Sequence, residues 1–462
     1  MINRNIMSTM KIKSLIWKMG LPMIVSMILQ AIYNVIDTIF VINMGENGVL
    51  GNEALTYAFP IQILIIAISV GTGIGINALL SKNLGENNKE IVNRVAGNGI
   101  VIGLAIYLIF LIFGLFFSKP YMQMMSDNSL IIKMGSDYLS ICCIFSFGAI
   151  GFAIYERFLQ ATGKTLYSTI AQVVGALCNI ILDYIFIYPL SLGVKGAALA
   201  TIIEQCVSLI VAMAFHYLIN KEIENNIKYL KPSLKIIKAV YKIGLPAMIM
   251  QGLLAVMMFS FIAVIKTIDD KIISSLLVGT FGIYYKIMQL ALFALFGLSN
   301  TLITITSFSY GMKNIKRLNL LVKHGIIDCI IVALVITIIF QLFAYDIASV
   351  FGMSIPDISN NGVEKKKIID LCTIAIRLSS IGYVFMGVSV GIQGILQGLN
   401  NIYRPVIISL LRLIVFVIPI GLLFTQFDNV TYNIWWTFPL AEVLCNIIAI
   451  LLFVPIIKKV NN

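Results

Sequence analysis

The chain has 462 residues, of which 59% are hydrophobic and 12% are charged, and its mean hydropathy is +0.97. Soluble domains carry about 25% charged residues, so this composition excludes a soluble enzyme, a disordered protein and a disulfide-rich secreted domain. The formal net charge of +12 could indicate a nucleic-acid partner, but the basic residues lie mostly in loops between apolar segments, which argues against nucleic acid.

Apolar segments that are long enough to cross a bilayer follow one another along the whole chain. A spanning helix needs about 20 apolar residues, and the segments lack the alternation of apolar and polar residues that is typical of barrel strands. The sequence therefore predicts an all-α polytopic membrane protein with twelve transmembrane helices. The predicted segments are 15–42, 54–80, 96–117, 136–158, 169–188, 194–219, 243–265, 274–308, 324–344, 369–396, 405–425 and 433–457.

Positive charge is distributed unequally between the two sets of loops. One set, which includes both termini, holds 22 lysines and arginines, whereas the opposite set holds 8. Cytoplasmic loops are enriched in these residues. Both termini are therefore predicted to be cytoplasmic.

Four features of the first half recur in the second half in the same order, 224 to 238 residues later. This duplication predicts two six-helix lobes of the same orientation, related by a pseudo-two-fold axis along the membrane normal. A two-lobe plan favours a transporter over a channel, because rocking lobes expose a cleft to one side at a time. The lobes are predicted at 1–219 and 243–462, with a cytoplasmic loop at 220–242. The recurring pairs are 17–25 with 241–249, 81–89 with 307–315, 158–165 with 395–402, and Glu204 with Glu442.

Polar residues gather at a similar depth in the first lobe. Asp37, Asp183 and Thr201 lie five to seven residues inside the predicted outer ends of their segments. Asn34 precedes Asp37 by one helical turn and Asn179 precedes Asp183 by one turn, so each pair shares a helix face. Intramembrane charges are functional candidates, and these oxygens predict a site for Na⁺ or for a shared proton. Alternatively, each aspartate reaches the interface or caps a neighbouring helix.

Other polar and soft side chains have more than one interpretation. The equivalent positions of Glu204 and Glu442 favour a shared structural role, such as a hydrogen bond to a neighbouring backbone group. Lys286 either lines the cleft or pairs with an acid or a carbonyl group. Met257 and Met288 belong to a Met- and Phe-rich set that forms either an adaptable wall for a substrate or a lipid-facing stripe.

The Gly-Leu-Pro helix start, the aspartate of the first segment, SKNLGENNK at 81–89, FLQATGKT at 158–165, the Asn-x-x-x-Asp of the fifth segment and GAALAT at 196–201 together resemble the multidrug and toxic compound extrusion (MATE) family. The resemblance covers nearly the whole chain and is closest to the DinF- and MepA-like bacterial branch. It implies a cation site in the N-terminal lobe. The residues that match the family's site are Asp37, Asn179, Asp183 and Thr201.

The second lobe departs from the pattern of NorM-like members, which also carry acids in helices 7 and 10. Helix 7 contains Gln251 but no acid, and Met386 stands about where the aspartate of helix 10 would be. The counterpart of Asp37 in the repeat is Phe261. We therefore expect no cation site in the second lobe.

The resemblance implies a monomeric antiporter of the bacterial inner membrane, driven by Na⁺ or H⁺, that exports organic cationic drugs by alternating access. No catalytic residue, cofactor or nucleic-acid partner is expected. A lipid-linked sugar or lipid flippase of a related superfamily is the first alternative, and a passive channel is the second. The candidates for the substrate cleft are Gln251, Lys286, Met257 and Met288.

Overall fold

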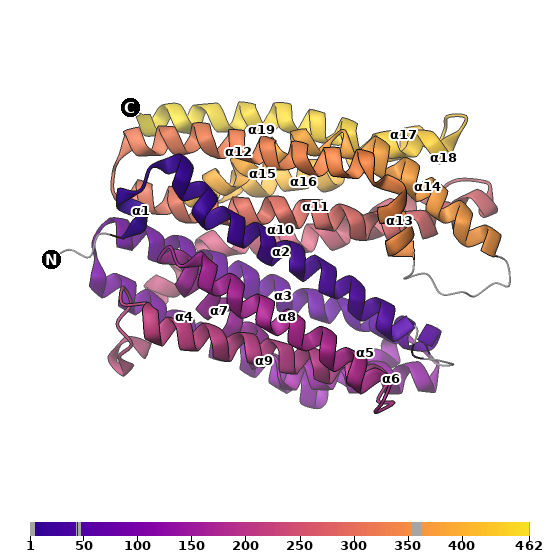
Figure 1. Cartoon of the computed structure of the whole chain (residues 1–462), viewed down its shortest axis with the longest axis horizontal. Coiled ribbons are helices and arrows are strands. Elements are labelled where there is room, and N and C mark those ends of the chain that lie inside the picture. The colour runs from indigo at the N-terminus through magenta and orange to yellow at the C-terminus, as the bar shows by residue number, and fades with distance from the viewer. Residues whose placement is uncertain (1–4, 43, 45–47, 353–361, 462) are drawn as a thin grey trace. The chain divides into compact units, whose positions relative to one another are not determined.

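The computed structural model describes residues 5–42, 44, 48–352 and 362–461, and this part of the chain is helical, without any strand (Figure 1). Short helical elements are η1 (Ile227–Leu230), η2 (Leu411–Val415), which has π geometry, and η3 (Ile434–Trp436). The α-helices are α1 (Ile6–Thr9), α2 (Ile12–Ile42), α3 (Gly48–Gly85), α4 (Lys89–Phe116), α5 (Ser118–Met125), α6 (Ser129–Ile144), α7 (Phe147–Ala161), α8 (Thr165–Ile187), α9 (Val194–Ile219), α10 (Leu234–Ile265), α11 (Lys271–Gly311), α12 (Ile315–Leu342), α13 (Ala344–Gly352), α14 (Gly362–Ser380), α15 (Tyr383–Gly398), α16 (Tyr403–Leu410), α17 (Val417–Phe424), α18 (Val430–Asn433) and α19 (Thr437–Asn461).

The helices account for the predicted membrane spans, with two breaks. Among the described residues, ten helices are long and apolar enough to cross a membrane, and up to twelve spans result if each of two bent helix pairs counts as one. The bends are 43° between α6 and α7 and 56° between α14 and α15, so the predicted segments 136–158 and 369–396 are broken. At the second break an added Cβ on Gly382 would meet the Pro439 Cα at 2.8 Å, which explains a glycine there. The all-α architecture with twelve spans is confirmed.

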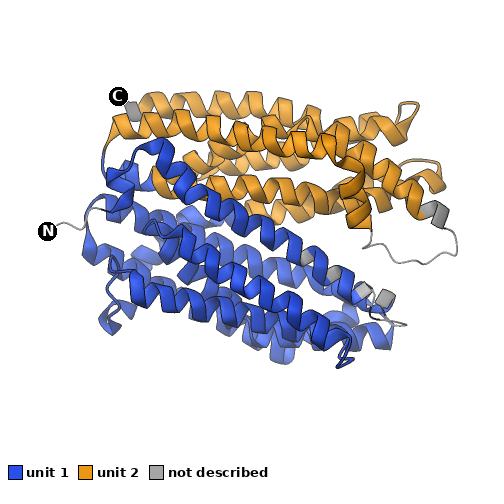
Figure 2. Cartoon of the chain, in the orientation of Figure 1, with its two compact units in different colours: residues 1–248, 307–313 blue, residues 249–306, 314–462 orange. Residues whose placement is uncertain are grey.

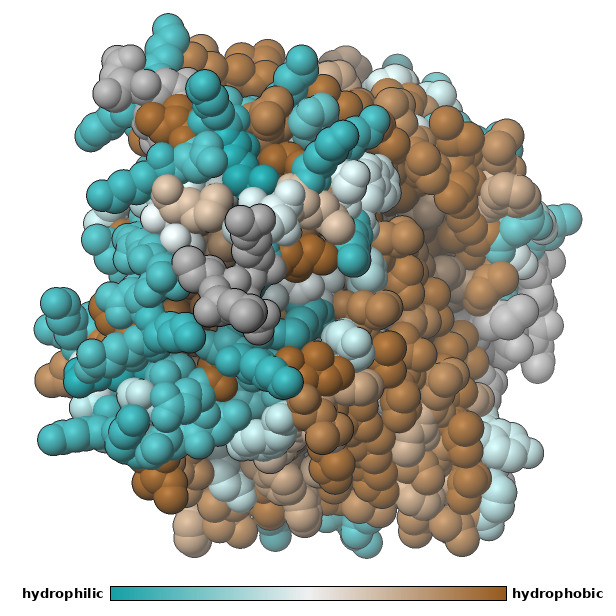
Figure 3. Space-filling model, turned by 60° about the vertical axis from the view of Figure 1, so that its left-hand side comes forward, coloured by the Kyte–Doolittle hydropathy of each residue, from teal (hydrophilic) through white to brown (hydrophobic). Residues whose placement is uncertain are grey.

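Apolar side chains cover the flanks of the helices. Figure 3 shows hydrophobic side chains over a broad area of this face and hydrophilic ones gathered toward one side of the view. On α4, Leu104, Ile109 and Phe116 are more than half exposed, and on α12 so is Ile338. Exposed apolar area of this extent is unusual for a soluble protein and is what a surface in contact with lipid requires.

The chain forms two compact units, each described by itself (Figure 2). Unit 1 comprises residues 1–248 and 307–313, and unit 2 comprises 249–306 and 314–462. The predicted boundaries at 219 and 243 differ from this division. The loop 220–242 packs as part of unit 1, because polar groups of α4 and of the turn between α7 and α8 bind it.

Two asparagines near the start of α4 hold this loop. The Asn93 Oδ1 atom accepts a hydrogen bond from the Glu224 backbone N–H at 2.9 Å, and the Asn98 Oδ1 atom accepts one from the Ser233 N–H at 2.7 Å. Between them, Gly97 leaves room for η1, since an added Cβ would lie 2.2 Å from the Tyr229 carbonyl oxygen. The loop therefore depends on the absence of a side chain at position 97.

Gly97→Ala is expected to displace the loop from α4 and to speed tryptic cleavage after Lys228. Overpacking costs about 1–3 kcal/mol, which corresponds to roughly a five- to 150-fold increase in the open population that a protease cuts. Limited trypsin digestion followed by mass spectrometry measures the rate. Gly252→Ala is the control, because an added Cβ there meets no atom within 4 Å. Equal cleavage of the two variants would contradict this account of Gly97.

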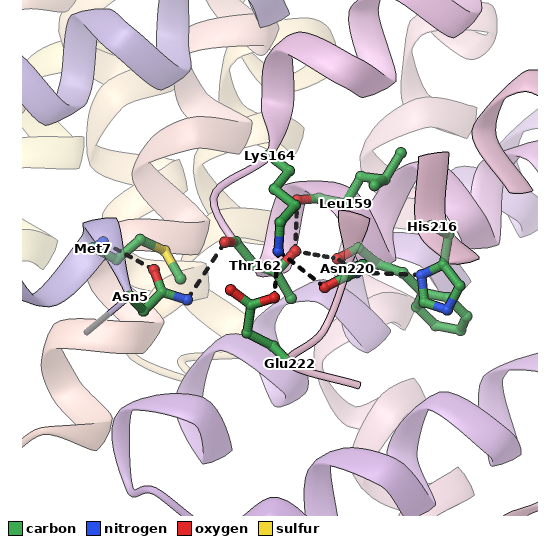
Figure 4. Close-up of polar contacts among 9 residues, drawn as sticks. Asn5, Met7, Leu159, Thr162, Lys164, His216, Asn220 and Glu222 are labelled. Atoms are coloured by element: carbon green, nitrogen blue, oxygen red, sulfur yellow. Dashed lines mark hydrogen bonds and ion pairs between the residues drawn. The ribbon is translucent and has the colours of Figure 1, made fainter. Parts of the chain in front are cut away.

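The turn inside FLQATGKT connects the loop with the start of the chain (Figure 4). Lys164 forms an ion pair with Glu222, and the Asn5 side chain donates a hydrogen bond to the Thr162 carbonyl at 3.4 Å. Gly163 has a φ of +82°, which favours glycine. The motif is thus a structural anchor at one end of unit 1.

Candidate cation site

Helix α8 carries two of the predicted residues on a buried face. Asn179 and Asp183 are 1% and 0% exposed. The other buried positions of this helix recur every three or four residues and include Gln172 and Gly175, so the interior face of α8 is polar and lined by small residues. The prediction that Asn179 and Asp183 share a face is confirmed. Helix α8 packs against both α2 and α9 within unit 1.

The neighbouring helices carry the other predicted residues. Asp37 lies on α2, and its charge interacts with that of Asp183. Thr201 lies on α9, where its hydroxyl donates to the Ala197 carbonyl at 2.9 Å, so the lone pairs of its oxygen stay available. The side chain of Asn34 lies outside the described part of the structure. Unit 1 therefore carries the described members of the predicted set on three helices that pack together.

Several oxygens of this site lack hydrogen-bond partners among the residues that the structure describes. They are both carboxylate oxygens of Asp183, Oδ1 of Asp37 and Oδ1 of Asn179. Buried polar groups are nearly always paired, and an unpaired buried charge is costly. Carboxylate, amide and hydroxyl oxygens are ligands that suit a hard cation, so the residues present fit Na⁺ chemically. A bound proton would equally satisfy one of the two carboxylates.

Two tyrosines near Asp37 add polar groups to the site that the sequence analysis missed. Tyr33 lies one helical turn before Asp37 on α2. Tyr138 of α6 is buried, and its hydroxyl accepts a hydrogen bond from the Gln62 side chain at 2.6 Å. The four-residue spacing from Asp37 could have indicated Tyr33. Tyr138 had no such signal, because it comes from a distant segment.

In unit 2 an aromatic cluster occupies the position that corresponds to Asp37. Phe261 is fully buried, and its ring centroid lies 4.8 Å from that of Phe281 and 4.9 Å from that of Phe438. Met386 is also buried. Apolar side chains therefore stand in unit 2 at the position that corresponds to Asp37 and about where NorM-like members carry the aspartate of helix 10.

The candidates for a substrate cleft lie on α10 and α11 of unit 2. Gln251 and Lys286 are half-buried, whereas Met257 and Met288 are 1% and 7% exposed. The burial of the two methionines contradicts a lipid-facing stripe, whereas their place in an adaptable wall for a substrate stays a prediction. They face the interior because α10 and α11 are in contact, as shown by the Tyr285 hydroxyl, which donates to the Leu254 carbonyl at 3.1 Å.

Comparisons of the sequence and of the structure with known proteins both find multidrug transporters of the MATE type. The MatE family model matches residues 22–185 and 246–423. Multidrug export protein MepA of Staphylococcus aureus (strain bovine RF122 / ET3-1) is 23% identical over 437 residues, which cover 94% of this chain and 91% of MepA.

Two solved structures share the fold along almost the whole chain. A crystal structure of MATE in complex with MaL6 has a TM-score of 0.91 at 21% identity, with 100% of both chains covered. The outward-facing conformation of a multidrug resistance MATE family transporter of the MOP superfamily also has a TM-score of 0.91, at 22% identity, with 99% of both chains covered. The family model matches most of both halves of the chain, including the regions that carry most of the motifs. This chain therefore belongs to the MatE family.

Proposed function

We propose that the chain is a cation-coupled antiporter that exports organic cations across a bacterial cell membrane, with Na⁺ or H⁺ as the coupling ion. The buried, unpaired oxygens of Asp37, Asn179 and Asp183 carry the proposal, because they need a positive charge that no described side chain supplies. Thr201 completes the set. The name of the relative MepA, a multidrug export protein, supports the substrate class.

The anchoring of α2 on α8 indicates how a bound ion would act. The Thr169 hydroxyl donates to the Pro22 carbonyl at 2.8 Å, and the Ser26 hydroxyl donates to the Gln172 side chain. Asp37 lies about 16 Å further along the helix than Ser26, at 1.5 Å per residue. A cation shared by Asp37 and Asp183 would draw this far part of α2 onto α8, so ion binding and release would move α2 about its anchored end. For antiport, the protein would bind the coupling ion and the drug in turn, not both at once.

Transport by purified protein in liposomes tests the proposal. Ethidium, a fluorescent organic cation, is expected to leave the vesicles only when an inward Na⁺ gradient or an inward proton gradient is imposed. Ethidium flux that is independent of both gradients would indicate a passive channel. Translocation of a fluorescent lipid-linked sugar without any movement of ethidium would indicate a flippase.

Lys231 is expected to lie in the cytoplasm and Lys366 outside the cell, because basic residues are concentrated on the cytoplasmic side. Both positions are exposed. A membrane-impermeant maleimide should therefore label Lys366→Cys in intact cells, and Lys231→Cys only after permeabilisation. The unsubstituted chain measures labelling of its own cysteines. The opposite pattern would reverse the orientation.

A further inference from the structure

The two glutamates at equivalent positions of the repeat have different surroundings. Glu442 of α19 pairs with Arg412, which is 2% exposed, and the Arg412 Nε and Glu442 Oε1 atoms lie 3.7 Å apart. Glu204 of α9 is 4% exposed and forms no ion pair with any residue that the structure describes. The shared structural role that the sequence suggested is therefore not what the surroundings of the two residues support.

A glycine explains this difference. The offset of 237 residues that aligns 158–165 with 395–402 places Gly175 at the position of Arg412. An added Cβ on Gly175 would lie 1.9 Å from the Ser208 Oγ atom and 3.1 Å from the Glu204 Oε1 atom. Unit 1 thus has no room for the cationic side chain that neutralises the glutamate of unit 2.

One neutral group does contact the Glu204 carboxylate. The Ser208 hydroxyl donates to its Oε1 atom at 3.4 Å, and its Oε2 atom has no hydrogen-bond partner within the described ranges. A neutral donor at this distance compensates a buried charge only in part. The ionised form of Glu204 is therefore only partly compensated by the groups that contact it.

Glu204 lies beside the residues of the candidate cation site. Glu204 follows Thr201 by one turn on α9, its carboxylate faces Gly175, which precedes Asn179 by one turn on α8, and its charge interacts with that of Asp183. No group of three or more His, Cys, Asp or Glu side chains among the described residues could hold one metal ion, so Glu204 is not a further ligand of an ion at Asp37 and Asp183.

We infer that Glu204 is a positioning residue of the cation site, whose uncompensated charge strengthens the binding of a monovalent cation at Asp37 and Asp183. The inference rests on the proposed function of that site. At an effective dielectric constant of about 20, a unit charge within about 10 Å changes the affinity for a cation by roughly tenfold. The pairing of Glu442 with Arg412 removes this effect from unit 2.

The same substitution at the two equivalent positions tests the inference. Glu204→Gln should raise about tenfold the concentration of the coupling ion, Na⁺ or H⁺, that gives half-maximal ethidium efflux, with little change in the maximal rate. Its Tm in detergent should stay equal or rise, because a buried unpaired charge is removed. Glu442→Gln should leave the half-maximal concentration unchanged and lower the Tm, because Arg412 loses its partner. Glu204→Asp should restore most of the ion dependence.

The possible outcomes separate this inference from the proposed function. The role of Glu204 would be overturned if Glu204→Gln reached half-maximal efflux at the same ion concentration as the wild type. A fall in its Tm like that of Glu442→Gln would also overturn it. So would a failure of Glu204→Asp to restore the ion dependence. If Asp183→Asn still loses ion-driven efflux, the proposed function stands. If the wild-type protein responds to neither Na⁺ nor H⁺, both proposals fail.

Discussion

Asp37→Asn and Asp183→Asn are each expected to abolish ion-driven ethidium efflux while the protein remains folded. Each change removes one charge but keeps the shape of the side chain. The loss of a unit charge about 4 Å from a bound cation costs on the order of 4 kcal/mol at an effective dielectric constant of about 20, or about a thousandfold in affinity. The double variant should be little worse than either single variant, because residues that act as a unit are not additive.

Efflux from proteoliposomes that contain equal amounts of folded protein is the measurement. Gln251→Ala is the control, since Gln251 belongs to unit 2 and the cation site to unit 1. This variant should keep ion-driven efflux and change mainly which drugs are exported. Full ion-driven transport by Asp37→Asn would defeat the proposed mechanism, and loss of coupling in Gln251→Ala would place the cation site elsewhere.

Phe261→Ala is expected to be the most destabilising of these changes. Phe261 packs against Phe281 and Phe438 and is 0% exposed, and its truncation leaves a cavity in the aromatic cluster. Truncation of a buried phenylalanine costs about 3–5 kcal/mol. A fall in Tm in detergent, together with a lower yield of folded protein, is the measurement.

Phe259→Ala on the same helix serves as the matched control. Phe259 is 58% exposed, so removal of its ring leaves no cavity and the Tm should change little. A similar Tm for the two variants would show that the aromatic cluster does not stabilise unit 2. The presence of a phenylalanine rather than an acid at position 261 would then need another explanation than the stability of unit 2.

Part of the cation site could be predicted because its signals are local. Asn179 and Asp183 are four residues apart on one helix, and a charged residue within an apolar run stands out without any structure. Tyr138 and Gln62 could not be predicted in this way. They lie within α6 and α3, far from Asp37 in the sequence, and no spacing from Asp37 marks either of them as a member of the site.

The sequence by itself determined the class of the protein, its spans and its duplication, because the hydropathy and the length of each segment are local properties that decide whether it crosses a bilayer. The tertiary structure decided which groups compensate one another. The pair of Arg412 with Glu442 and the contact of Gly175 with Glu204 join residues about thirty positions apart. In sequence the two glutamates look alike. Whether a buried charge is neutralised depends on what the facing helix leaves room for, and only packing decides that.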